Sequence, residues 1–349
     1  MSWRSALRRS LLLVGEATGA SDSFSRSGWR RQRLAILCYH GVSLDDEHLW
    51  DPGLYMSPAT LERRMSYLRA HDYSVLPLGE ALERLRDGTL PPRAVAVTFD
   101  DGTHDFEVRA RPILERYRIP ATVYVTTFYV HFQRPVFPVT CSYLLWKGRS
   151  RSLFLPGVLD RTPVSLADAK ARQRVLGDIV VYARDNGFSA EEKDELLGRL
   201  AAALRIDYGD LVGRRLLTLM NVAEIATVAS AGFDIQLHTH RHRMPRERSL
   251  FMREIEDNRA SLEAIVGYRP SHFCYPSGEY FDSAVVWLRE SGIQSAVTCD
   301  TGLASAHVDP LLLPRIVDTE AKTILDVSGW VTGLSAFLRI SGRSSQSLF

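Results

Sequence analysis

Short apolar segments alternate with amphipathic ones along most of the chain, starting near residue 34. Three apolar segments predict strands: LAILCYHGV (34–42), AVAVTF (94–99) and ATVYVTT (121–127). AVAVTF is short and β-branched, which predicts a parallel strand buried on both faces. Helical periodicity fills the segments between and after them, at 58–71, 78–87 and about 105–117. Ser57 and Pro58 predict the N-cap and first residue of the first of these helices. This alternation is typical of parallel strands joined by helices.

The pattern changes between about 130 and 215. This region shows helical periodicity in LADAKARQRVLGDIVVYARDNG and AEEKDELLGRLAAALRI but no strand pattern, which predicts a helical insertion. Strands then resume with FDIQL, SHFCYP and SAVTC. About six strands alternating with helices predict either a parallel α/β barrel or a doubly wound sheet.

Composition narrows the possible partners. The 349 residues are enough for one large α/β domain with insertions, or for two domains. Lysine and arginine number 43 against 41 acidic residues, so the net charge of +2 argues against nucleic acid as a partner. The four cysteines lie far apart without a CxxC pair, and three lie in predicted strands, so we expect buried free thiols: Cys38, Cys141, Cys274 and Cys299.

The two ends of the chain differ in composition from the segment between them. Residues 1–33 are basic, and their longest apolar run, LLLV, is too short for a signal sequence or a membrane span. We therefore expect a flexible leader, no stable membrane insertion and a cytoplasmic location, with the basic residues able to touch an anionic membrane surface. Residues 321–349 are interpreted as a C-terminal tail. The sequence does not indicate an oligomeric state.

The first chemical motif is TFDDG at 98–102, where two carboxylates end a predicted strand. Active sites of α/β proteins lie at the carboxyl ends of their strands. Asp100 and Asp101 therefore suit a general base beside a metal ligand. The alternative is an ordinary Asp-Gly turn with a capping aspartate.

The second motif is HTHRH at 238–242, which follows the strand FDIQL. If His238 and His242 begin a helical turn, their i and i+4 spacing places both rings on one face, where they can bind one metal ion. His240 then points away. The alternative, a basic patch formed with Arg241, Arg243 and Arg246, lacks the interleaved aromatic residues of a single-strand nucleic-acid site.

The third motif is FCYPSGEY at 273–280, a strand followed by a loop. The backbone N–H groups of this loop could face the same crevice and serve an oxyanion or the substrate, and an ordinary strand-ending turn fits equally well. The loop residues are Tyr275, Pro276, Ser277 and Gly278.

Taken in order, YHGV (39–42), TFDDG, HTHRH, FCYPSGEY and LPRI (313–316) resemble the polysaccharide deacetylase family, the group related to the nodulation chitooligosaccharide deacetylase. The resemblance runs from about Leu34 to Val317 and is closest in motif order to the poly-N-acetylglucosamine deacetylase branch. It implies a distorted (β/α) barrel as a catalytic domain over 34–320, interrupted by the insertion at 130–215.

The resemblance also implies roles for the motif residues. Asp100 matches the general base, while Asp101, His238 and His242 match the ligands of one divalent ion, usually zinc. The implied activity is a metal-dependent hydrolase that removes N-acetyl groups from an N-acetylhexosamine-containing saccharide, which is then the expected partner. Hydrolysis of another amide or acyl group, or an inactive saccharide-binding homologue, are the alternatives.

Two departures from the family pattern affect these roles. Cys274 stands where the family has an arginine that orients the base, and Arg315 is our predicted replacement. The C-terminal leucine-x-histidine that usually provides the general acid is absent. In the poly-N-acetylglucosamine branch the histidine of an early YH motif has this role, so we assign it to His40, with His104 and His307 as alternatives.

Overall fold

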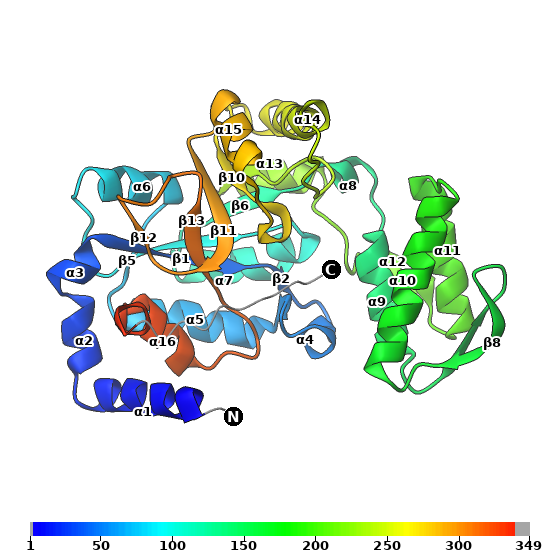
Figure 1. Cartoon of the computed structure of the whole chain (residues 1–349), viewed down its shortest axis with the longest axis horizontal. Helices are drawn as coiled ribbons and strands as arrows, with labels where there is room; N and C mark the ends of the chain where they lie inside the picture. Colours follow the sequence, from blue (N-terminus) through cyan, green and yellow to red (C-terminus); the bar gives the residue numbers. More distant parts are fainter. Residues whose placement is uncertain (1–2, 339–349) are drawn as a thin grey trace.

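The computed structural model describes residues 3–338, and a closed barrel of seven parallel strands forms its centre (Figure 1). The barrel closes because β1 pairs on one side with β13 and on the other with β5. The barrel strands are β1 (Arg33–Tyr39), β5 (Ala94–Phe99), β6 (Thr122–Val125), β9 (Asp234–Leu237), β10 (His272–Cys274), β11 (Ser295–Thr301) and β13 (Leu313–Val317). Of the two folds that the strand pattern left open, the barrel is therefore correct.

The two-residue period of the strands divides the apolar core in two. Leu34 and Ile36 of β1 pack inside the barrel with Leu85 of α6 (Leu78–Arg86), which covers the amino-terminal end of the strands. Leu37 points the other way, into the larger core between the strands and the outer helices. Because successive side chains alternate, later residues on the inward face of β1 and β5 reach the carboxyl end of the barrel interior.

Helices cover the outside of the barrel, as the alternating pattern predicts. Ser57 caps the first of them by accepting the N–H of Thr60, as its sequence predicts. The predicted helix at 105–117 begins as a π-helical turn, Phe106–Ala110, before α7. The barrel helices are α5 (Pro58–Ala70), α7 (Arg111–Arg116), α8 (Phe128–His131), α13 (Val222–Ser230), α14 (Arg248–Val266) and α15 (Asp282–Glu290). Short elements complete this part: α4 (Glu47–Trp50), β2 (Gly41–Val42), β3 (Tyr55–Met56), β4 (Ser74–Val75) and β12 (Ala304–Ser305).

The segment between about 130 and 215 forms a lobe beside the barrel, drawn in green in Figure 1. Helices make up most of it, as the sequence predicted, and a hairpin of two strands accompanies them. Its own apolar core includes Leu153, Leu197 and Leu200, and Lys147 ties it to the barrel by pairing with Asp46 at 2.6 Å. Its elements are α9 (Phe137–Lys147), β7 (Ser152–Leu155), β8 (Leu159–Ser165), α10 (Ala169–Asp185), α11 (Ala190–Ala203) and α12 (Tyr208–Gly213).

The amino-terminal segment forms three helices that lie beside the last two helices of the chain (Figure 1). These are α1 (Trp3–Ala17), α2 (Ala20–Ser25), α3 (Gly28–Arg31), α16 (Ile324–Val331) and α17 (Leu334–Phe337). Arg30 is buried and donates to the carbonyls of Val331 and Ala94, each at 2.9 Å. Arg30, one of the basic residues of this segment, therefore attaches the segment to the barrel. The domain limits at 33 and 320 stay a prediction.

Within the described range, 3–338, every helix is too short or too polar to cross a membrane. The four cysteines are free thiols, as expected from their spacing. Cys38, Cys274 and Cys299 lie on barrel strands, and Cys141 lies on α9.

Candidate active site

Asp100 and Asp101 follow the last residue of β5 at the carboxyl end of the barrel. Asp101 has a φ of 70° and Gly102 a φ of 72°, so the chain turns sharply directly after Asp100. A side chain at Gly102 would approach Val125 to 2.9 Å, which leaves room only for glycine. A left-handed aspartate costs on the order of 1–2 kcal/mol. This strained turn lets both neighbouring carboxylates face one crevice, as the sequence predicted.

Asp101 meets two histidines of the HTHRH motif at one oxygen atom. Its Oδ1 lies 3.2 Å from Nε2 of His238 and 3.3 Å from Nε2 of His242. Nδ1 of His238 is 2.8 Å from the carbonyl of Cys274, so it carries the proton and donates to that oxygen. This leaves the Nε2 lone pair directed toward Asp101, which is how protein histidines are prepared to bind metal.

The backbone that brings these histidines together is a loop. The helical turn predicted from the i and i+4 spacing is wrong, because Thr239 and His242 have φ values of 62° and 52°. Glu254 of α14 shapes the loop by accepting the N–H of Arg241 at 2.7 Å. His240 points away from the other two rings, as expected, with Nδ1 2.9 Å from the hydroxyl of Thr127.

The three side chains fit a divalent metal ion. One donor atom from each of Asp101, His238 and His242 lies within 4.8 Å of the other two. Two imidazoles and one carboxylate are a common protein ligand set for zinc and leave positions open for water and substrate. His238 is buried, whereas the side chain of His242 is 40 % exposed, so the group faces both the barrel and the solvent.

Asp100 forms a two-pronged ion pair with Arg315 inside the barrel. Nη1 and Nη2 of Arg315 each lie 2.7 Å from one oxygen of the carboxylate, and both side chains are buried. Burial would raise the pKa of Asp100, but the charge and hydrogen bonds of Arg315 hold this pKa well below its usual range. The carboxylate is therefore ionised at neutral pH. Arg315 lies where a base-orienting arginine is needed, although it comes from β13.

Cysteine thiols lie beside Asp100, where the family pattern has a base-orienting arginine. Sγ of Cys274 lies 3.3 Å from Oδ2 of Asp100 and 3.3 Å from Nη2 of Arg315. Sγ of Cys38 lies 3.6 Å from the same carboxylate oxygen. Sequence reasoning did not include Cys38 in the site, although its i, i+2 spacing from His40 places both on the inward side of β1.

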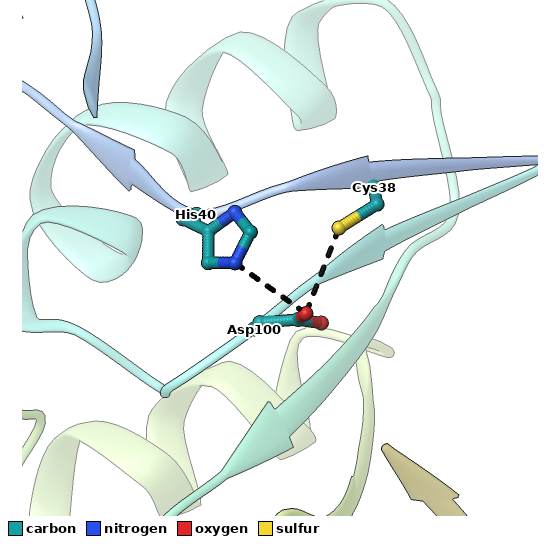
Figure 2. Close-up of side chains that lie close together, drawn as sticks. All are labelled: Cys38, His40 and Asp100. Atoms are coloured by element: carbon teal, nitrogen blue, oxygen red, sulfur yellow. Dashed lines mark hydrogen bonds and ion pairs between the residues drawn. The ribbon is translucent and has the colours of Figure 1, made fainter. Parts of the chain in front are cut away.

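His40 follows β1 and points at Asp100, as Figure 2 shows. Its Nε2 lies 3.6 Å from Oδ2 of Asp100, and its side chain is 19 % exposed. Of the two alternatives, His104 is paired with Glu224 at 3.1 Å. His307 follows β12, which pairs with the amino-terminal end of β1, so it lies at the opposite end of the barrel. Of these three histidines, His40 is the one that the fold brings to the aspartates.

The loop after β10 also reaches the crevice. Pro276 and Ser277 line a cavity of about 680 Å³ together with His242. The N–H of Tyr275 donates to Val297 at 3.2 Å and that of Gly278 to Tyr275 at 2.9 Å, so these two groups already have partners within the protein. The loop thus lies where a substrate loop was expected, and its role toward an oxyanion stays a prediction.

The sequence was compared with models of known protein families. The family model described as polysaccharide deacetylase matches residues 87–137 and 211–296, which include TFDDG, HTHRH and FCYPSGEY. The chain carries a polysaccharide deacetylase domain. The resemblance read from the motifs is thereby confirmed, and the interruption of the match falls on the lobe between β6 and α13.

Two groups of curated relatives of this deacetylase domain are both poly-beta-1,6-N-acetyl-D-glucosamine N-deacetylases. The one from Staphylococcus aureus is 36% identical over 75 residues, 22% of this chain and 26% of the relative. The one from Escherichia coli is 30% identical over 94 residues, 27% of this chain and 14% of the relative. The chain thus spans about a quarter or less of the length of the curated relatives that it matches.

Solved structures of deacetylases share the fold. The Streptococcus pyogenes deacetylase PplD in complex with acetate has a TM-score of 0.55 at 19% identity, covering 83% of this chain and 93% of that one. IcaB from Ammonifex degensii has a TM-score of 0.55 at 17% identity, covering 86% and 97%. The barrel expected from the family resemblance is therefore confirmed.

Proposed function

We propose that the protein is a metal-dependent hydrolase that removes N-acetyl groups from an N-acetylhexosamine-containing oligo- or polysaccharide. The observation that carries this proposal is the pairing of two neighbouring carboxylates with different partners. Asp101 faces His238 and His242, while Asp100 is held by Arg315. One carboxylate is thus placed to hold a metal ion and the other to accept a proton.

Asp101, His238 and His242 would hold the ion, most consistently zinc. A divalent ion bound there lowers the pKa of water and polarises an amide carbonyl. Asp100 is ionised and fixed by the guanidinium of Arg315, so it is oriented to accept the proton of an attacking water. Arg315 contacts the base and also the buried groups of Thr98, Cys274 and Thr298, so in this proposal it serves as a positioning residue.

His40 completes the proposed set as the group that gives a proton to the departing amine. It lies on the solvent side of Asp100, with a ring nitrogen 3.6 Å from the carboxylate. A histidine can hold a proton at neutral pH and release it to an amine leaving group. Pro276 and Ser277 line the cavity beside His242 and are placed to contact the sugar.

The test is acetate release from a panel of chitooligosaccharides, poly-β-1,6-N-acetylglucosamine fragments and peptidoglycan fragments, with metal content measured on the same preparation. We expect release by the wild type and a loss of about 10²- to 10⁴-fold in Asp100→Asn, which keeps the fold but cannot accept a proton. Release of formate from a formamide, or of the acid from a non-sugar amide, added to the panel, with no acetate from the saccharides, would support the other amide hydrolase. Saccharide binding with no turnover would support the inactive homologue.

A further inference from the structure

Arginines surround the cavity next to the candidate metal ligands. The cavity of about 680 Å³ beside His242 is lined by Arg241, Arg243 and Arg253, from the loop after β9 and from α14. A second hollow of about 330 Å³, lined by Arg246, shares Met244 and Glu279 with the first. The two hollows therefore adjoin one another and carry four guanidinium groups.

The acidic residues of the same lining leave a positive excess. They are Glu254 and Glu279. Glu254 is buried and accepts from Nη1 of Arg241 at 3.1 Å and from Nε of Arg243 at 3.0 Å, so one carboxylate serves two guanidinium groups. Four arginines against two glutamates leave two positive charges in excess, and a bound divalent ion at His242 would increase this excess.

Two of these arginines lack a close ion-pair partner among the described residues. In the part of the chain that the structure describes, neither Arg246 nor Arg253 has a carboxylate oxygen within 4.0 Å, and both are exposed. The guanidinium of Arg246 instead lies 5.1 Å above the ring centre of Phe281. The whole chain has a net charge of only +2, so a local excess of this size is concentrated at one site. Such a concentration attracts anions and is stabilised by binding one.

We propose that the natural saccharide carries an anionic group, a phosphate or a carboxylate, on the sugar next to the one that loses its acetyl group. Arg243, Arg246 and Arg253 bind this group. The guanidinium fork matches both anions with paired hydrogen bonds, and the exposed side chain of Tyr280 lines the second hollow beside them. The location of the reacting sugar at His242 rests on the proposed function, whereas the preference for an anion does not.

The preference is measured by isothermal titration calorimetry of the full chain with matched neutral and charged probes. The first pair is methyl N-acetylglucosaminide and N-acetylglucosamine 1-phosphate. The second pair is chitotetraose and the hyaluronan tetrasaccharide, in which glucuronate alternates with N-acetylglucosamine. We expect at least one charged probe to bind about tenfold more tightly than its neutral partner, and this advantage to shrink as salt is raised. Preference within the first pair alone identifies a phosphate, and within the second alone a carboxylate.

The variant is Arg246→Gln with Arg253→Gln, and the control is Arg184→Gln, whose exposed side chain lies on α10 in the lobe. We expect the double variant to lose the preference for the charged probe and to keep its affinity for the neutral one, while the control changes neither. Equal binding of charged and neutral probes, or a preference that survives in the double variant, would overturn the proposal. So would inorganic phosphate binding as tightly as the sugar phosphate, because this would indicate an adventitious anion only.

The binding result is separate from turnover. If no probe or saccharide releases acetate but the charged probes still bind more tightly, the proposed function fails and this inference stands. If acetate is released equally well from charged and neutral saccharides with the same KM, the proposed function stands and this inference fails.

Discussion

Replacing Arg315 by Met tests the predicted replacement for the family's base-orienting arginine, which here comes from β13. The substitution leaves Asp100 buried and removes its two hydrogen bonds of 2.7 Å to the guanidinium. Breaking a buried pair from one side costs about 3–5 kcal/mol, a large part of the 5–15 kcal/mol that usually holds a domain folded. Arg315→Lys keeps the charge but cannot form both bonds, so we expect a smaller loss of unfolding free energy.

The effect on activity follows from the pKa of Asp100. Burial raises this pKa, and Arg315 opposes the effect in the wild type. With Arg315 removed, burial is less opposed, so the carboxylate takes up a proton at a higher pH. We therefore expect the acidic limb of the turnover profile to move to higher pH, and the maximal turnover to fall by at least about 10²-fold because the base is no longer oriented.

A matched control separates this role from mere stability. Arg64 and Asp318 form a second buried pair at 2.8 Å, outside the site. Arg64→Met should cost a similar unfolding free energy in urea titration but leave the pH profile of the folded protein unchanged. Asp100→Asn combined with Arg315→Met should lose less stability than the sum of the single changes, by about 2 kcal/mol. If Arg315→Met behaves in every assay like Arg64→Met, Arg315 does not position the base.

Three further predictions concern the metal, the acid and pH-dependent stability. His238→Ala and His242→Ala should each abolish metal retention in elemental analysis, whereas His240→Ala should retain it; equal loss from all three would mean that the ligand set is wrong. His40→Asn should keep its metal but lower turnover strongly, and less so for an activated aryl acetamide whose amine leaves easily; unchanged turnover on the sugar amide would remove it as the acid. Burial raises the pKa of Asp105 to about 7, so the folded protein keeps a proton that the unfolded chain loses near pH 4. This contribution to stability is present below about pH 4 and is lost as pH rises to about 7, which lowers the unfolding free energy by about 4 kcal/mol. In urea titrations, Asp105→Asn should abolish this pH dependence of the unfolding free energy. The same pH dependence in the variant as in the wild type would contradict the assignment to Asp105.

Six of the seven barrel strands could be predicted from the sequence, because buried parallel strands have a strong local signature, whereas β13 was not predicted as a strand. AVAVTF coincides with β5, and the Ser-Pro pair begins α5 as predicted. The proximity of Asp100, Asp101, His238 and His242 could also be predicted, since polar residues directly after such strands gather at one end of a barrel. These are local patterns, and local patterns can be read from one sequence.

Closure of the sheet and the partners of each site residue depend on contacts between distant segments. Arg315 meets Asp100 only because β1 joins β13 to β5, a pairing that no local pattern reveals. The two histidines converge through left-handed residues fixed by Glu254 on another element, so their spacing indicated the right pair with the wrong backbone. The arginine-lined cavity was read in the sequence as a basic run, because its relation to the site exists only after the loop folds over the barrel. Backbone hydrogen bonding and periodicity are encoded residue by residue, whereas charge pairing and cavities arise from packing among segments up to hundreds of residues apart.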